Sequence, residues 1–225
     1  MYDWIITNKE LLKIFYGLVL ALVCLIIVLK THKLFKLSLH QGIRYFRNAF
    51  FFYCLAFLSR YILGALNYYG YLADYSFLTK VLFEFFLVMG GFFLLYSLLW
   101  KKIEPFGADY DSSLFNAKIL LFYFMTFIIV ALDYLWVSYN FMIISQIIIF
   151  LSATAISYLN YARNGSRHQF LKFYFIAILL SLIAWILNSS LQYFDWSRGI
   201  LINVYILNII FFLLFLYGVI KLSSN

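Results

Sequence analysis

The sequence predicts an all-α integral membrane protein built as a bundle of seven transmembrane helices. Hydrophobic residues make up 66% of the 225 residues, and charged residues make up only 12%. So little charge cannot cover the apolar core of a water-soluble domain of this length. The apolar residues also fall in runs of about 20, which is the length that a helix needs to cross the hydrocarbon of a bilayer.

Seven apolar segments have this length. The predicted spans are residues 11–29, 46–66, 76–99, 114–132, 141–161, 170–189 and 200–220. Phenylalanine-rich runs such as residues 50–52 continue through a span, whereas the strands of a β-barrel would show short alternating segments. Because every connection is too short for a soluble domain, residues 1–225 are predicted to form a single transmembrane domain.

The basic residues orient these spans, taken in chain order. The connections after the first, third and fifth spans, and the residues after the seventh, carry Lys30, Lys33, Lys36, Arg44, Arg47, Lys101, Lys102, Arg163, Arg167 and Lys221. The connections on the other side, 67–75, 133–140 and 191–199, hold one arginine and no lysine. Cytoplasmic loops are enriched in lysine and arginine. We therefore expect a multi-pass protein of the cell membrane with an extracellular N-terminus and a cytoplasmic C-terminus.

A weak internal similarity suggests a parallel repeat, with spans 1–3 matching spans 5–7 and span 4 as the linker. A shift of 124 residues places residues 61–69 over residues 185–193, and Glu84 over Asn208. The identities are few, and so biased a composition also produces such matches by chance. The 3+1+3 repeat and a chance match both stay open.

Among the ionisable residues of the predicted spans, Arg60, Lys80 and Glu84 stand out. A charge at mid-span costs about 2.5 to 3.5 kcal/mol on insertion scales, so such residues face protein or water. At about 1.5 Å of rise per residue, Arg60 and Glu84 both lie about 10 Å below the outer boundary. This depth predicts a buried Arg60–Glu84 ion pair between spans 2 and 3, with Lys80 one turn nearer the outside.

Several asparagines lie in the same outer half as these charges. The predicted pocket residues are Arg60, Lys80, Glu84, Asn67, Asn188, Asn203 and Asn208. One interpretation is structural, because ion pairs and asparagines hold membrane helices together. The other is a pocket for a small polar or amphipathic ligand, in which Arg60 and Lys80 meet any anionic group. The adjacent Gly90 and Gly91 are predicted to form a hinge in span 3.

The first connection is strongly basic. On a helical wheel one face of residues 30–47 carries Lys33, Lys36, His40, Arg44 and Arg47. This pattern predicts a short amphipathic helix on the inner leaflet, where anionic lipid attracts each cation by about 1 kcal/mol. Ordinary membrane topology also accounts for these charges, and a surface that docks a partner protein is a third interpretation.

The sequence contains no recognisable catalytic motif and no recognisable cofactor-binding motif. His32, His40 and His168 are irregularly spaced, and the predicted spans contain no histidine that would ligate a metal or activate a serine. We therefore expect no enzyme activity, no metal and no cofactor. The net charge of +8 is gathered between apolar runs, so it indicates membrane topology, and no nucleic-acid partner is expected.

These features favour a receptor- or sensor-like subunit that signals through a separate protein partner or a homo-oligomer. The first alternative is a small solute transporter or an ion channel. Transporters often contain helices broken by proline or glycine, but here the single proline, Pro105, lies in a connection. A channel needs a polar stripe along a whole span, and here the polarity is concentrated in the outer half. A structural subunit of a membrane complex is the second alternative.

Overall fold

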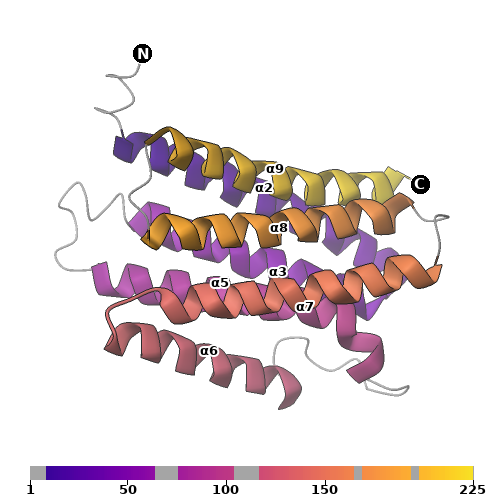
Figure 1. Cartoon of the computed structure of the whole chain (residues 1–225). Helices are drawn as coiled ribbons and strands as arrows, with labels where there is room; N and C mark the ends of the chain where they lie inside the picture. The colour runs from indigo at the N-terminus through magenta and orange to yellow at the C-terminus, as the bar shows by residue number, and fades with distance from the viewer. Residues whose placement is uncertain (1–8, 64–75, 104–116, 165–168, 194–197, 225) are drawn as a thin grey trace.

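The computed structural model describes residues 9–63, 76–103, 117–164, 169–193 and 198–224 (Figure 1). Within these ranges the chain forms seven long α-helices and one short π-helical segment, η1. In chain order they are α2 (Lys9–Ser38), α3 (Gln41–Leu58), η1 (Ser59–Leu63), α5 (Ser76–Ile103), α6 (Ala117–Leu135), α7 (Asn140–Asn164), α8 (Gln169–Tyr193) and α9 (Arg198–Ser224). The all-helical class predicted from the sequence is confirmed.

The long helices lie side by side in one bundle, with α3 at its centre (Figure 1). Helix α3 packs between α2 and α5, and α9 contacts both α2 and α8. Helix α7 packs against both α8 and α5, while α6 lies at the margin of the bundle against α5 and α7. We call the end of the bundle with the turn at residues 39–40 the α2–α3 end, and the opposite end, with the turn at residues 136–139, the α6–α7 end.

Six of the described helices are long and apolar enough to cross a membrane, which indicates a multi-pass membrane protein. The exception is α3, which corresponds to the second predicted span. Its 18 residues include two arginines, and more than half of them are buried by the surrounding helices. The seven-span count, the repeat and the orientation of the termini therefore stay predictions.

The chain reverses direction at residues 39–40, and this corrects one prediction. Helix α2 ends at Ser38, Leu39 adopts a left-handed backbone with φ of 51°, and α3 begins at Gln41. Residues 30–47 therefore do not form one helix. The predicted basic face divides between the end of α2, with Lys33 and Lys36, the turn itself, with His40, and the start of α3, with Arg44 and Arg47.

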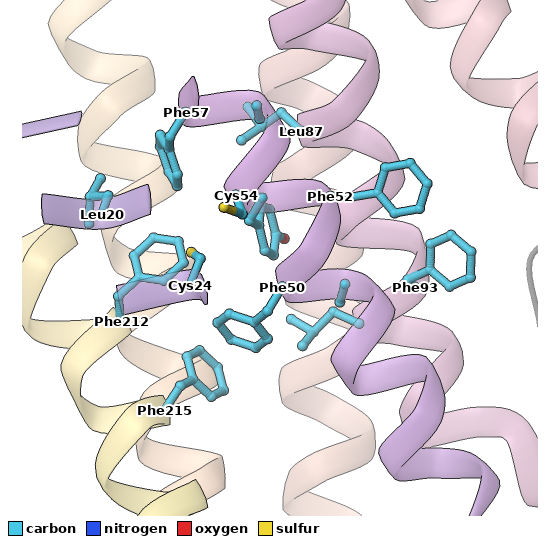
Figure 2. Close-up of a cluster of buried hydrophobic side chains, with 14 of the residues drawn as sticks. Leu20, Cys24, Phe50, Phe52, Cys54, Phe57, Leu87, Phe93, Phe212 and Phe215 are labelled. Atoms are coloured by element: carbon cyan, nitrogen blue, oxygen red, sulfur yellow. The ribbon is translucent and has the colours of Figure 1, made fainter. Parts of the chain in front are cut away.

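Aromatic rings fill the space around α3 (Figure 2). On one side Phe50 contacts Phe212 and Phe215 of α9, with ring centroids 6.0 and 5.3 Å apart. On the other side Phe52 stacks on Phe93 of α5 at 5.2 Å. Each such ring pair contributes about 0.5 to 1.5 kcal/mol beyond the area that it buries. These contacts fix α3 between α9 and α5, and so fix the position of η1.

We predict that Phe50→Ala lowers the free energy of unfolding in detergent by about 3 to 5 kcal/mol, because a fully enclosed ring leaves a cavity. Phe51→Ala is the matched control, because Phe51 is the next residue and its side chain is 44% exposed. It should cost less than about 1 kcal/mol. Chemical unfolding followed by circular dichroism measures both, and equal losses would contradict the central position of α3.

Candidate functional site

A cavity of about 340 Å³ lies inside the bundle. Among the described helices only α6 contributes nothing to its walls. It extends from the α6–α7 end, where it meets Tyr139, to the middle of the bundle, where it meets Tyr53.

The cavity walls are mostly aromatic, with a few polar side chains. Tyr16 of α2 stacks on Tyr205 of α9 with ring centroids 4.6 Å apart, and both rings line the cavity. Asn188 of α8 and Asn208 of α9 also line it, and the Asn188 amide nitrogen donates to the Asn208 oxygen at 3.5 Å. The structure therefore brings these two predicted pocket asparagines together. Asn67 and the side chain of Asn203 lie outside the described residues.

Arg60 brings a positive charge to the cavity. It lies on η1, which continues directly from α3, and single π-helical turns of this kind are frequent at functional sites. The guanidinium carbon lies 4.3 Å from the centre of the Phe83 ring, and both side chains line the cavity. In the described part of the chain no carboxylate lies within ion-pair distance of Arg60, and its side chain stays exposed.

The predicted Arg60–Glu84 ion pair is wrong, because the structure pairs Glu84 with Lys80. The Lys80 ammonium lies 3.8 Å from a Glu84 oxygen, one turn away on the same helix, so α5 supplies both partners without help from α3. Glu84 is completely buried and lies outside the cavity lining. Neither of its oxygens accepts a hydrogen bond from the described residues.

Lys80 also lies outside the cavity lining and instead links α5 to the α6–α7 turn. Its ammonium donates to the Ser138 carbonyl at 2.8 Å and to the Asp133 carbonyl at 3.3 Å. It also lies 4.5 Å from the centre of the Tyr139 ring, which lines the cavity. Lys80 therefore holds in place a turn that forms part of the cavity wall.

Asp133 is a structural residue that the sequence analysis missed. Its carboxylate accepts hydrogen bonds from the backbone N–H of Phe141 at 3.0 Å and of Met142 at 2.7 Å, and from the Ser138 hydroxyl at 3.1 Å. It thereby caps the start of α7, where backbone donors lack partners inside the helix. The signal in the sequence was a carboxylate a few residues before an apolar run, in a segment interpreted only as a connection.

The predicted hinge glycines lie in a helix that runs unbroken from Ser76 to Ile103. A Cβ atom at Gly90 would come within 2.9 Å of the Tyr53 ring, and one at Gly91 within 2.9 Å of the Gln146 side-chain oxygen. The missing side chains therefore let α3 and α7 approach α5 closely. Bending at this pair stays a prediction.

Comparison with known proteins gives one similar sequence. A protein of Archaeoglobus fulgidus, described as an uncharacterized protein, is 25% identical over 215 residues, which cover 92% of this chain and 90% of the relative. No protein-family model and no solved structure matches the chain. The similarity extends along nearly the whole of both chains, but the relative's description names no activity. We therefore infer function from the cavity.

Removing Lys80 and removing Glu84 should have opposite consequences. Lys80→Met deletes one hydrogen bond to the end of α6 and one to the α6–α7 turn, and it leaves the buried Glu84 without its cation, so we expect a loss of about 3 to 5 kcal/mol. Glu84→Met should be neutral or stabilising, because it removes a buried charge whose oxygens lack hydrogen-bond donors. Chemical unfolding in detergent compares the two variants, and an equal loss in both would overturn this assignment.

Proposed function

We propose that this protein is a receptor- or sensor-like membrane subunit whose cavity binds a small amphipathic anion and whose signal passes to a separate partner protein. The observation that carries the proposal is the Arg60 guanidinium in the cavity wall, without a carboxylate partner among the described residues. A cation beside low-dielectric walls attracts an anionic group strongly, and a planar guanidinium suits a carboxylate or a phosphate.

The other walls define the rest of the ligand. Rings such as Phe83, Trp185 and Phe212 give the cavity apolar walls, and the Phe83 ring lies against Arg60. The side-chain amides of Asn188 on α8 and Asn208 on α9 offer one polar contact region in the cavity wall. A few polar groups placed within apolar walls are typical of sites for small molecules. The ligand that fits is small, apolar over most of its surface and negatively charged at one end.

The position of Arg60 suggests how binding would alter the fold. Arg60 contacts Phe83 of α5, and the same helix holds the α6–α7 turn through Lys80. A ligand that draws the guanidinium away from Phe83 changes the contacts between η1 and α5. The close packing of α5 at Gly90 and Gly91 carries that change towards the α2–α3 end. Because the connections within the chain are short, the output is assigned to a separate partner.

We predict that small carboxylates raise the melting temperature of the purified protein more than neutral amides of the same shape do. Arg60→Gln should weaken their binding about 10- to 100-fold, because one hydrogen bond to a charged group contributes about 1.5 to 3 kcal/mol. The matched control is Arg163→Gln, which removes an exposed guanidinium near the end of α7. Thermal unfolding in a neutral detergent, with a panel of carboxylates and amides, measures the effect.

Two results would contradict the proposal. If carboxylates bind the Arg60→Gln variant as tightly as the wild type, Arg60 does not take part in binding them. If no anion of the panel stabilises the wild type, the cavity is not an anion-binding site. Uptake of a bound carboxylate into liposomes that contain this protein alone would instead support the transporter alternative.

A further inference from the structure

A second cationic site lies at the α2–α3 end, away from the cavity. The turn at residues 39–40 folds the end of α2 against the start of α3. As a result the guanidinium carbons of Arg44 and Arg47 lie 5.9 and 5.7 Å from the centre of the same ring, Phe35. Arg47 also contacts His32, with 2.9 Å between its Nη1 and the ring Nδ1. We call His32, Phe35, Arg44 and Arg47 the basic corner.

The two guanidiniums of the basic corner are held in place by neighbouring side chains. Arg47 donates from Nη2 to the Asn48 side-chain oxygen at 3.1 Å, in addition to its contact with His32. Arg44 donates from Nη1 to the Gln41 side-chain oxygen at 3.5 Å. All of these partners are uncharged or cationic, so none of them neutralises either arginine. Two like charges are thus fixed beside one aromatic ring.

The described side chains offer no counter-ion for this pair of charges. Glu84 and Asp133 are the acidic residues whose side chains the structure describes, and both lie towards the α6–α7 end, where they contact Lys80 and the start of α7. Two fixed guanidiniums that have no carboxylate partner among the described side chains favour an external anion. Guanidinium groups bind phosphate oxygens through two parallel hydrogen bonds, which makes a phosphate group a good match.

The surroundings of the basic corner indicate where the phosphate comes from. Leu29 and Leu37 of α2 and Leu39 of the turn have side chains that are 62%, 77% and 54% exposed. The corner therefore lies at the end of an apolar helix, with exposed apolar side chains next to it. A phospholipid would place its phosphate at the basic corner and its acyl chains against these exposed leucines. Anionic lipids of a membrane leaflet attract clusters of basic residues.

We propose that the basic corner is a binding site for the phosphate group of an anionic phospholipid in the adjacent leaflet. The basic corner differs from the other positive charges at the α2–α3 end of the bundle. Lys33 and Lys36 are exposed on α2 and contribute diffuse charge, whereas Arg44 and Arg47 are oriented by a shared ring and by side-chain hydrogen bonds. Binding should therefore depend on the two arginines far more than on the two lysines.

The test compares two double variants of the full chain that remove the same charge. Short-chain phosphatidylglycerol, short-chain phosphatidylcholine and inorganic phosphate are titrated onto protein in a neutral detergent, with the melting temperature as the readout. We expect phosphatidylglycerol alone to stabilise the wild type. Arg44→Gln with Arg47→Gln should weaken its binding about tenfold or more, whereas Lys33→Gln with Lys36→Gln should stay within about twofold of wild type.

Three results would overturn the proposal. Equal losses in the two double variants would show attraction by diffuse charge alone. Stabilisation of the wild type by inorganic phosphate as strong as that by phosphatidylglycerol would assign the site to a soluble anion. The absence of any effect of phosphatidylglycerol on the wild type would remove the site.

A charge-preserving variant keeps the test decisive if the glutamine variant fails to fold. The double variant Arg44→Lys with Arg47→Lys retains the charge of the basic corner but loses the planar, forked donors of the guanidiniums. Phosphatidylglycerol binding about fivefold weaker than wild type would support the oriented pair. Binding equal to wild type would contradict it.

Discussion

The hydrocarbon of a bilayer offers no hydrogen-bond partner, so every polar group inside this bundle has to be satisfied by the protein itself. Lys80 meets that constraint through the carbonyls of Asp133 in α6 and Ser138 in the α6–α7 turn, and the Asp133 carboxylate meets it by capping α7. Gln146 donates to the Leu87 carbonyl across the α5–α7 contact. The buried Glu84 oxygens do not meet it, because they accept no hydrogen bond from the described residues. Arg60 is different from all of these, because its guanidinium lies over the Phe83 ring and lines a cavity. The position of the proposed ligand follows from that difference.

Helix α3 connects the two proposed sites. It begins beside the basic corner, and it continues into η1, which carries Arg60. Its arginines are compatible with a membrane protein because α2, α5 and α9 enclose its middle, where Phe50 and Phe52 contact rings on opposite sides. Cations therefore lie near the start of α3 and on η1 at its other end. A displacement of α3 along its axis would alter the contacts of both sites together.

The apolar runs predicted the helices well, because the length needed to cross a bilayer is a strong constraint on sequence. Depth along the helices also placed Arg60, Asn188 and Asn208 in one region, and all three line the cavity. Depth cannot, however, fix the direction in which a side chain points. That is why the predicted Arg60–Glu84 pair failed, although both residues were placed at a similar level, and why the reach of Lys80 to the α6–α7 turn was missed.

The turn at 39–40 was missed for a local reason. Its left-handed residue is Leu39, whereas the left-handed conformation is usually signalled by glycine or asparagine. Gly42, the nearest glycine, lies inside α3, where a Cβ atom would come within 2.5 Å of the Trp100 indole nitrogen. The wheel drawn through residues 30–47 therefore joined two helices. The contact of His32 and Phe35 with Arg44 and Arg47 depends on tertiary structure and has no local signal.

The central claim is that Arg60 keeps its charge available to a ligand in the cavity. An experimental density map of the full chain, purified in a mild detergent directly from the membrane in which it is made, tests this claim most directly. The account predicts non-protein density in the cavity against the Arg60 guanidinium, with no carboxylate of the chain bound to it. A carboxylate of the protein paired with Arg60 would contradict the account, because the counter-ion would then be built into the fold.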